Sequence, residues 1–366
     1  SFTNSEQVLV LYGDVPLITP ETLQDLIESG DNNSLKVLTA ILEDPTGYGR
    51  IVRDYDDNML CITEEKDADE ETKLINEINT GIMCIPAKWL TEALSQLDNN
   101  NAQGEYYLTD LIAKAVNQGI EINSVTCEDE MEVAGINNRV QLAEVESYYQ
   151  QLKATELMMS GVTFRDPARV DIRGYIKAGQ DITIDINVIF EGNNTISDNV
   201  SIGANCIIIN SVIYKGAEIL PNSIIENAEV GTNCSVGPFA RLRPGTKLAA
   251  KAKVGNFVEV KNANIGLGSK INHLSYIGDT DMGADVNIGA GTITCNYDGA
   301  NKHRTVIGDR VFVGSDTQLV APVTVEDGAT IGAGSTIRKT APADSLTLTK
   351  SEQKTVKGWQ RPVKKK

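Results

Sequence analysis

The chain has 366 residues, 41% of them apolar and 23% charged, which is typical of a soluble globular protein long enough for two domains. The net charge of −17 argues against nucleic acid as the main partner, and no run of about eighteen apolar residues is long enough to span a membrane. Six cysteines without a CxxC pair and only two histidines argue against a disulfide framework or a zinc site and favour a cytoplasmic protein.

The amino-terminal part alternates strand and helix signals in the manner of an α/β sheet. Residues 8–12 form an apolar run that ends in Gly13-Asp14, the way a parallel sheet brings a carboxylate to the edge where ligands bind. Thr19 before Pro20 predicts the N-cap of a helix over 21–28, which leaves Asp14 free for chemistry. Further strands are expected at 35–42, 77–82 and 121–126, and helices at 89–97 and 107–118.

Two further segments of this part stand out. Residues 44–51 carry Gly47 and Gly49, which would let the backbone approach a ligand, although a plain turn explains them equally well. A connecting helix over 138–161 is expected, with Asn137 or Asn138 as its N-cap. Its amphipathic pattern consists of Val140, Leu142, Val145, Tyr148, Leu152 and Leu157.

A ladder of apolar residues organises the rest of the chain. From Ile184 to Ile337 an aliphatic or aromatic residue returns about every six positions, a period that predicts a parallel β-helix. Small residues four places after a rung (Cys206, Val258, Thr292, Ala329 and Ser335) suit tight corners. Glycines directly after a rung (Gly203, Gly231, Gly255, Gly289 and Gly332) are expected to supply unusual backbone angles. The ladder is expected to break after Ile288, over residues 289–304.

Motifs along the whole chain resemble one enzyme family, the bacterial bifunctional N-acetylglucosamine-1-phosphate uridyltransferases/glucosamine-1-phosphate N-acetyltransferases. They occupy residues 11–17, 44–51, 77–81, 99–107, 237–245, 254–259, 287–301 and 358–362. The resemblance implies a partial, Rossmann-like α/β nucleotidyltransferase domain (1–137), a linker helix (138–161) and a left-handed parallel β-helix of hexapeptide repeats (162–366). The handedness comes from the family and not from the repeat period.

The resemblance also implies a function. Such an enzyme makes UDP-N-acetylglucosamine, a precursor of peptidoglycan and lipopolysaccharide, from glucosamine 1-phosphate, acetyl-CoA and UTP. It works in the cytoplasm as a homotrimer with shared active sites and has no nucleic-acid or membrane partner.

The implied uridyltransferase site lies in the first domain. Its residues for UDP-N-acetylglucosamine are Tyr12, Gly13, Asp14, Gly49, Glu64, Asn79 and Asn137. Asp14 and Asn137 resemble the pair that holds Mg²⁺, a cation that prefers oxygen ligands. The family's glycine-rich phosphate loop and its downstream lysine have no counterpart here. The first domain is therefore expected to lack its amino-terminal part, and uridylyl transfer is expected to be lost with the phosphate cradle.

The implied acetyltransferase site lies on the ladder. His273 matches the general base, and Arg243 and Lys261 match the residues that bind the sugar phosphate. Tyr276 and Asn287 match contacts to the sugar. The acetyl-CoA positions are Ala290, Asn296, Tyr297, Ser315, Ala333 and Lys350. The repeat spacing is expected to stack Arg243, Lys261 and His273 on neighbouring coils.

One of these positions departs from the family pattern. Lys350 stands where the family has arginine, so a contact to a CoA phosphate would lack a planar fork. The basic tail is expected to contact CoA or a neighbouring subunit, or to be solvated; its cations are Lys350, Lys354, Lys357, Arg361, Lys364, Lys365 and Lys366.

Alternatives remain at this point. A single histidine is by default a surface-turn residue, lysine and arginine are normally solvated, and small residues at Ser315 and Ala333 also suit corner packing. A sugar-nucleotide pyrophosphorylase with a regulatory β-helix would lack the set of His273, Arg243 and Lys261. A structural scaffold would not bind acetyl-CoA, and a β-helix carbonic anhydrase needs three zinc-binding histidines where two exist.

Overall fold

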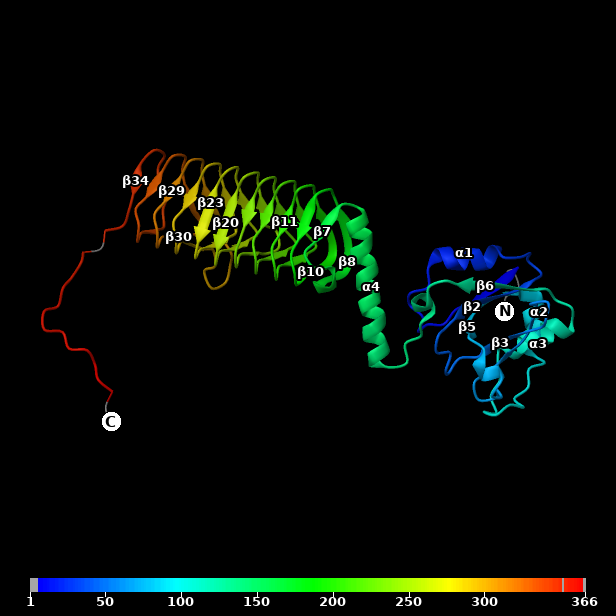
Figure 1. Cartoon of the computed structure of the whole chain (residues 1–366). Coiled ribbons are helices and arrows are strands. Elements are labelled where there is room, and N and C mark those ends of the chain that lie inside the picture. Colours follow the sequence, from blue (N-terminus) through cyan, green and yellow to red (C-terminus); the bar gives the residue numbers. More distant parts are fainter. Residues whose placement is uncertain (1–5, 351, 365–366) are drawn as a thin grey trace. The chain divides into compact units, whose positions relative to one another are not determined.

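The computed structural model describes residues 6–350 and 352–364 (Figure 1). The chain divides into two compact units, Ser1–Tyr149 and Gln150–Lys366. Lys365 and Lys366, the last cations of the predicted basic tail, lie outside the described residues. No helix in the described part of the chain is long and apolar enough to cross a membrane.

The first unit contains a six-stranded mixed sheet in the order β4-β3-β5-β2-β6, with β1 also paired to β5. Its strands are β1 (Gln7–Val10), β2 (Leu35–Ile41), β3 (Arg50–Arg53), β4 (Met59–Thr63), β5 (Glu77–Pro86) and β6 (Ile122–Cys127). The expected parallel setting of β1 is wrong, because β1 runs antiparallel to β5. The reason is that β2 covers one edge of β5 and β3 meets the other only at Ile78, so β1 fills the remaining edge at Met83–Pro86.

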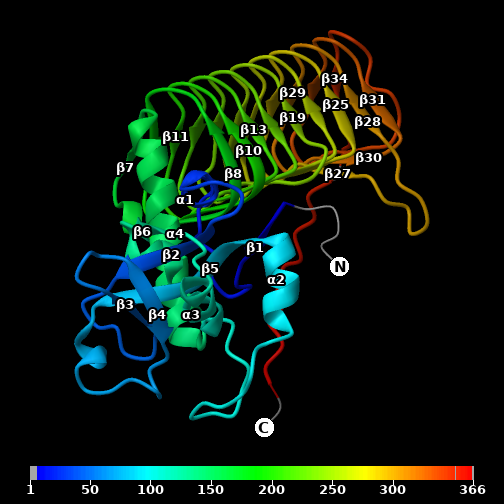
Figure 2. The same cartoon turned by 90° about the vertical axis from the view of Figure 1, so that its right-hand side faces the viewer.

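Helices cover both faces of this sheet (Figure 2). They are α1 (Pro20–Glu28), α2 (Ala87–Leu94) and α3 (Asp110–Asn117), with short 3₁₀ helices η1 (Thr72–Leu74) and η2 (Glu130–Val133). Thr19 caps α1 as predicted, since its side chain accepts a hydrogen bond from the amide of Thr22. Leu26 of α1 packs in one core cluster, whereas Leu90 of α2 and Leu111 of α3 pack in the other.

Helix α4 (Arg139–Met159) belongs partly to each unit, because the division between the units falls after Tyr149. Of the two candidate caps, Asn138 is the N-cap: its Oδ1 accepts hydrogen bonds from the amides of Val140 and Gln141 at 2.9 and 3.1 Å.

The expected amphipathic stripe of α4 is only partly buried. Val145 and Leu157 are buried, but the prediction is wrong for three positions that are exposed: Val140, Leu142 and Leu152. The early part of the helix contacts the first unit through Tyr148 and Asp129, and the later part contacts the second through Gln150 and Ile172. No single stripe is covered along the whole helix for that reason.

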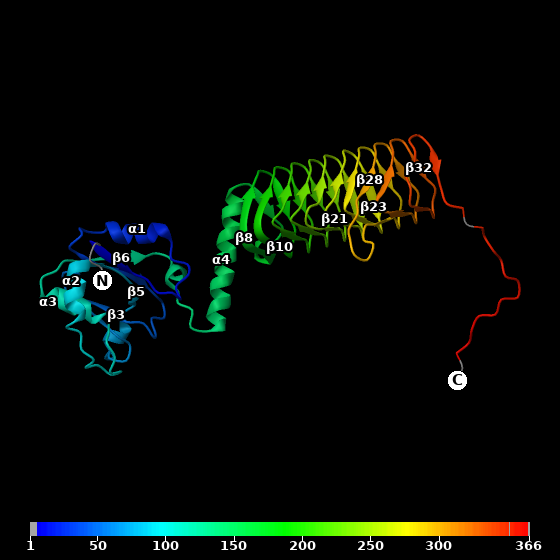
Figure 3. The same ribbon diagram turned by 180° about the vertical axis from the view of Figure 1, so that it is seen from behind.

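The second unit is a parallel β-helix whose coils each add one strand to three parallel sheets (Figures 2 and 3). One sheet has eleven strands: β7 (Val162–Phe164), β9 (Ile182–Ile184), β11 (Ser201–Ile202), β14 (Glu218–Ile219), β17 (Ser235–Val236), β20 (Lys253–Asn256), β23 (Lys270–His273), β26 (Asn287–Ile288), β29 (Phe312–Val313), β32 (Thr330–Ile331) and β34 (Leu346–Thr347). A short 3₁₀ helix, η3 (Pro167–Arg169), joins β7 to the next strand.

The other two sheets are joined through long strands in the first coils. A second column starts with β8 (Val170–Ala178) and β10 (Val188–Ile196) and continues with β12 (Ile207–Ile209), β15 (Ile224–Glu226), β18 (Arg241–Leu242), β21 (Glu259–Lys261), β24 (Tyr276–Gly278), β27 (Ile293–Cys295), β30 (Gln318–Val320) and β33 (Thr336–Ile337). The third runs from β10 through β13 (Val212–Ile213), β16 (Glu229–Val230), β19 (Lys247–Leu248), β22 (Asn264–Ile265), β25 (Thr280–Met282), β28 (Thr305–Ile307) and β31 (Val323–Val325).

The six-residue ladder is confirmed as the core of this unit. Every apolar rung from Ile184 to Ile337 is buried in one continuous cluster. The ladder breaks later than predicted. Thr294 is fully buried at the rung position after Ile288, where its hydroxyl accepts a hydrogen bond from the amide of Gly278 at 2.7 Å. The excursion from the column is therefore residues 296–304, between β27 and β28.

The role predicted for the glycines after the rungs is wrong. Left-handed backbone angles occur elsewhere, at asparagine and aspartate and at other glycines. The glycines are needed because the next coil lies against their α-carbon: a β-carbon at Gly255 would meet the oxygen of Asn272 at 2.0 Å, and one at Gly289 would meet the nitrogen of Ser315 at 2.5 Å. Close approach of coils, rather than turn geometry, selects glycine there.

Candidate active sites

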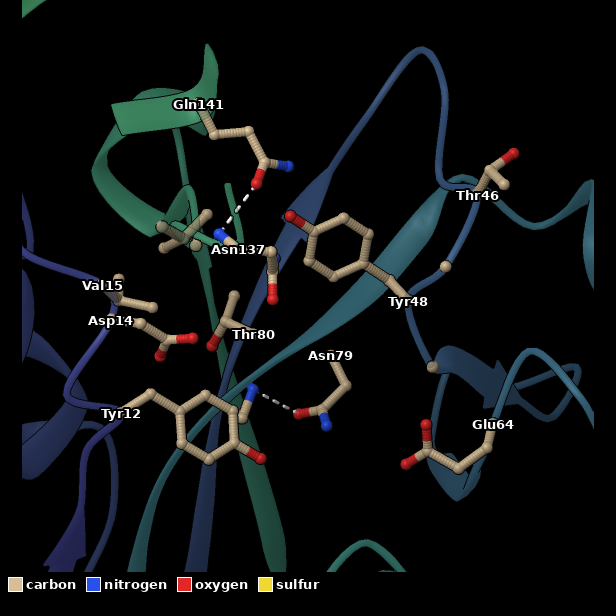
Figure 4. A pocket seen from close by; sticks show the side chains of 15 residues that line it. Tyr12, Asp14, Val15, Thr46, Tyr48, Glu64, Asn79, Thr80, Asn137 and Gln141 are labelled. Carbon is tan, nitrogen blue, oxygen red and sulfur yellow. Dashed lines mark hydrogen bonds between the residues drawn. The ribbon is translucent and has the colours of Figure 1, made fainter. Parts of the chain in front are cut away.

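A pocket of about 340 Å³ in the first unit brings together six of the seven residues expected to bind the sugar nucleotide (Figure 4). They are Tyr12, Asp14, Gly49, Glu64, Asn79 and Asn137. Gly13, the seventh, is exposed and lies between two lining residues without lining the pocket itself. Gly47, the other glycine noted in segment 44–51, also lines the pocket. Residues without a predicted role complete the wall: Val15, Thr46, Tyr48, Thr80, Gly81, Val133, Gly135 and Gln141.

Tyr12 and Asn79 are oriented by Gly81, which lies within β5 and has a φ of +79°. The Gly81 amide donates a hydrogen bond to Asn79 Oδ1 at 3.0 Å, and the Tyr12 ring lies directly against the Gly81 α-carbon. Partial burial, together with the carboxylates of Glu64 and Asp14, raises the pKa of the Tyr12 hydroxyl. Tyr12 is therefore a neutral hydrogen-bond donor at the mouth of the pocket.

Asp14 and Asn137 enter the pocket from different elements, Asp14 after β1 and Asn137 just before α4 (Figure 4). The amide nitrogen of Asn137 donates to Gln141 Oε1 at 2.8 Å, so the first turn of α4 fixes this loop. A carboxylate and an amide oxygen are the donor chemistry that Mg²⁺ accepts when phosphate and water supply its other ligands. Among the described residues there is no cluster of three His, Cys, Asp or Glu side chains able to hold a metal without such help.

The opposite wall of the pocket is rigid. Thr109 is buried and donates its hydroxyl proton to Glu64 Oε1 at 2.8 Å. Arg50, next to the lining residue Gly49, is only 2% exposed and pairs with Glu65 at 2.8 Å. The described residues that line this pocket include neither lysine nor arginine, so the wall offers a bound phosphate chain no cation.

The second site follows one corner of the β-helix, where β20 and β23 pair Asn256 with His273. Backbone hydrogen bonds join the residues at this corner to those at the same corner of the following coils. The amide of Gly291 donates to the oxygen of Leu274, and the amide of Asp316 donates to the oxygen of Ala290. The Gly334 amide donates to Ser315 oxygen in the next coil. His273 therefore begins a column that continues through Ala290, Ser315 and Ala333.

Around the same corner, successive strands carry the residues expected to bind the sugar phosphate. The amide of Arg243 donates to the oxygen of Val260, which sets Arg243 beside Lys261 on neighbouring coils. Arg243 also pairs with Glu259 at 2.8 Å, and this hydrogen-bonded carboxylate raises the pKa of its guanidinium. His273 lies on a different sheet, one corner of the coil away from Arg243 and Lys261. The expected stacking is therefore correct for Arg243 and Lys261 and wrong for His273.

Lys302 is a cation that the sequence did not single out. It lies in the excursion, which projects from the column as a small hairpin with Tyr297 paired to Lys302 (Figure 3). The pKa of Lys261 is lowered, mainly by the neighbouring Lys302 ammonium and to a smaller extent by desolvation. Two neighbouring ammonium groups repel one another, so an anion bound between them would be stabilised. The signal was weak in the sequence, since the two lysines are 41 positions apart.

The remaining predicted residues lie around this cluster or apart from it. Tyr276 OH accepts a hydrogen bond from Asn296 Nδ2 at 3.4 Å, and Asn296 is 8% exposed. Asn287 lies in β26 beside Lys270, while Tyr297 is exposed with its hydroxyl bonded to the oxygen of Gly299 at 2.7 Å. Lys350 is exposed and follows β34, the last strand of the described residues.

His303, the second histidine of the chain, has a structural role. Its Nε2 lies 2.6 Å from Asp298 Oδ2, and Asp298 Oδ1 accepts hydrogen bonds from the amides of Ala300 and Asn301. These bonds hold the pKa of Asp298 well below its usual range, and the largest contributions come from the Asn301 amide and the His303 ring. The pair closes the tip of the hairpin.

Two protein-family models agree with this architecture. Residues 304–339 match the bacterial transferase hexapeptide (six repeats) model, and residues 172–272 match the model of the GMPPB C-terminal domain. The protein is thus an α/β domain followed by a left-handed β-helix of the hexapeptide transferase class, as predicted. A solved UDP-N-acetylglucosamine acyltransferase from Francisella novicida is 18% identical, covering 51% of this chain and 64% of that one, with a TM-score of 0.23.

Much greater similarity is found among proteins called bifunctional protein GlmU. Those of Cupriavidus pinatubonensis and Stutzerimonas stutzeri are 55% and 54% identical over 362 residues, covering 99% of this chain and 80% of each relative. The Pseudomonas putida protein is 54% identical with the same coverage. The chain belongs to the GlmU family of bifunctional enzymes, which confirms the resemblance seen in its motifs. It spans four fifths of the length of these relatives.

Proposed function

We propose that this chain transfers an acetyl group from acetyl-CoA to glucosamine 1-phosphate, with His273 as the general base. The observation that carries the proposal is the placement of His273 at one corner of the β-helix. Small residues follow it along one column, at Ala290, Ser315 and Ala333, and the cations Arg243 and Lys261 lie around the corner.

The geometry of His273 suits a base. Its Nδ1 lies 3.1 Å from Asn256 Oδ1, and an amide oxygen only accepts, so Nδ1 carries the proton and Nε2 is the free base. Nε2 takes a proton as the substrate amine attacks the thioester carbonyl. The new C–N bond forms, the C–S bond breaks, and the imidazolium returns the proton to the CoA sulfur.

The two substrates fit different surfaces. The phosphate of the sugar would meet Arg243, Lys261 and Lys302, where charge-assisted hydrogen bonds are strong. The pantetheine arm would lie along the column of Ala290, Ser315 and Ala333, because small side chains leave room against the backbone. Tyr276 and Asn287 would contact the sugar, and Tyr297 and Lys350 the acyl donor.

The test is a thiol-release assay with acetyl-CoA and glucosamine 1-phosphate. His273→Ala is expected to lower kcat by about 10²–10⁴-fold, the usual contribution of a general base. His303→Ala is the matched control, since His303 closes the hairpin tip through Asp298, and its kcat is expected to stay within a few-fold of wild type. Equal activity of wild type and His273→Ala would remove His273 as the base.

For the first unit we propose a site for UDP-N-acetylglucosamine in which Asp14 and Asn137 hold Mg²⁺ beside the phosphates, where the ion would offset phosphate charge. Because the described residues that line the pocket include no cation, a polypeptide of these 366 residues is expected to bind the sugar nucleotide without forming it from UTP and N-acetylglucosamine 1-phosphate. Calorimetry with UDP-N-acetylglucosamine with and without Mg²⁺ tests binding. Rapid pyrophosphate release by this polypeptide would contradict the lost transfer.

We also propose a homotrimer in which the hairpin 296–304 serves a site shared between subunits. The exposed Tyr297 ring at the start of the hairpin supports this. Six free thiols support a reducing compartment, the cytoplasm. Sedimentation at micromolar concentration is expected to give a trimer, and a monomer with full acetyl-transfer activity would refute shared sites.

A further inference from the structure

One corner of the β-helix places an aspartate where the coils that precede it have glycine or asparagine. The residues of this corner column from Gly192 to Asp279 all have left-handed backbone angles: Gly192, Asn210, Asn227, Gly245, Asn262 and Asp279. Glycine and asparagine adopt that conformation at low cost, so the turn itself does not require a carboxylate. Asp279 is 7% exposed and belongs to the coil from which the hairpin 296–304 departs. A buried charge at that coil calls for a different explanation.

Asp279 is bonded to both ends of the hairpin. Its Oδ2 accepts a hydrogen bond from Asn296 Nδ2, at the first residue of the excursion. Its backbone oxygen accepts from the amide of Thr305 at 3.1 Å, where the chain rejoins the column. Its backbone amide donates to the oxygen of Lys261 at 3.0 Å, and Asn262 Nδ2 donates to its Oδ1 at 2.5 Å.

These bonds settle the orientation of the Asn296 amide. A carboxylate only accepts hydrogen bonds, so the NH₂ group of Asn296 must face Asp279. The same nitrogen lies 3.4 Å from the hydroxyl of Tyr276. The side-chain oxygen of Asn296, Oδ1, is thereby turned away from both groups, and within the described residues no protein group donates a hydrogen bond to it.

The carboxylate also remains charged. Burial raises the pKa of Asp279, but hydrogen bonds from Asn262 and Asn296, together with the charges of Lys261 and Lys302, lower it overall. Asp279 in turn opposes the lowering of the Lys261 pKa by Lys302. One buried anion therefore lies beside the two cations proposed to bind the sugar phosphate.

We propose that Asp279 is a positioning residue for acetyl transfer: it fixes the Asn296 amide so that its carbonyl oxygen accepts a hydrogen bond from the amine of the acceptor sugar. This inference rests on the proposed acetyltransferase function. Asn296 lies next to Tyr276, on the sugar side of the site, so its oxygen orients the amine lone pair toward the thioester carbon. Asp279 itself touches no substrate.

The test is Asp279→Gly in the full chain, assayed with acetyl-CoA and glucosamine 1-phosphate. Glycine tolerates the φ of +48° at this position, so the backbone is not strained. We expect kcat to fall by about tenfold or more, because the amine loses its orientation. The KM for glucosamine 1-phosphate should not rise, because a negative charge beside its phosphate has been removed.

Asp285→Gly is the matched control. Asp285 also has a left-handed backbone, with φ of +54°, but is exposed and outside the site. It should keep kcat within about twofold of wild type. The kcat of Asp279→Asn should lie between those of Asp279→Gly and Asp285→Gly. The new side chain keeps an acceptor for Asn296, but its NH₂ group faces the NH₂ donor of Asn262.

The outcomes separate cleanly. Unchanged kcat in folded Asp279→Gly overturns the inference, and so does a raised sugar KM with unchanged kcat. If Asp279→Gly does not fold, Asn262→Gly replaces it: φ is +46° there, and only the second anchor of the carboxylate is lost. Unchanged kcat in that variant also overturns the inference. An inactive wild-type chain would instead refute the proposed function.

Discussion

The ring of Tyr12 lies on the α-carbon of Gly81, so that a β-carbon at position 81 would come 2.0 Å from Cε2 of the ring. Gly81 also has a φ of +79°, which side chains rarely adopt. One glycine thus lines the proposed nucleotide-sugar pocket and sets the position of the Tyr12 ring in its wall.

Gly81→Ala is expected to displace the Tyr12 ring, because an exposed ring yields more easily than a buried strand. The affinity for UDP-N-acetylglucosamine should fall about tenfold, measured by calorimetry, as about 1.4 kcal/mol of contact is lost. Gly104→Ala is the control, with φ of +69° and nothing within 4 Å of the added carbon. The Gly104→Ala variant has the backbone strain without a new contact, so its affinity for UDP-N-acetylglucosamine should equal that of wild type. Equal affinities in the two variants would contradict the role of the ring contact.

Lys302→Ala is expected to weaken binding of the sugar phosphate. The loss of one charge-assisted contact should raise the KM for glucosamine 1-phosphate about tenfold, leaving the KM for acetyl-CoA unchanged. The effect should shrink at high ionic strength. Lys270→Ala, an exposed lysine of β23, serves as the control. An equal rise of both KM values would indicate a distorted hairpin instead of a lost cation.

Thr294→Val should destabilise the β-helix although valine fits the apolar ladder better. The Gly278 amide would lose its acceptor in the buried core, at a cost of about 1–3 kcal/mol. Thr330→Val, which changes an outward-facing residue of β32, should stay within about 0.5 kcal/mol of wild type. Chemical denaturation measures both. A Thr294→Val variant more stable than wild type would refute the hydrogen-bond argument.

The cysteines should differ in their reaction with an alkylating agent at pH 8. Burial raises the pKa of Cys206 and Cys234 to about 11, so almost none of either is thiolate at that pH. Cys61 is only partly buried and should be labelled first. Mass spectrometry of timed samples gives the order, and labelling in denaturant provides the control. Equal native rates for Cys61 and Cys206 would contradict the buried position of Cys206.

The sequence predicted the column because a six-residue period can be detected without knowing the neighbours of any residue. The sequence did not predict the contacts that depend on how the coils stack on one another. Lys302 meets Lys261 only through the hairpin, and Thr294 fills a rung with a polar group. The glycine prediction failed in the same way, because the reason for Gly255 is the backbone of the next coil at Asn272. The uridyltransferase residues came from motif resemblance, and Gln141 was missed because α4 approaches the pocket only in the fold.

The hairpin 296–304 also has a consequence for how such enzymes diversify. Contacts between neighbouring coils usually join residues 17 or 18 positions apart, whereas Ala284 and Asp309 are 25 apart, yet β25 and β28 pair in normal register. The extra length is absorbed without any change in the column. Since each coil rests only on its neighbours, we expect that a loop of different length or sequence could replace this one without altering the scaffold.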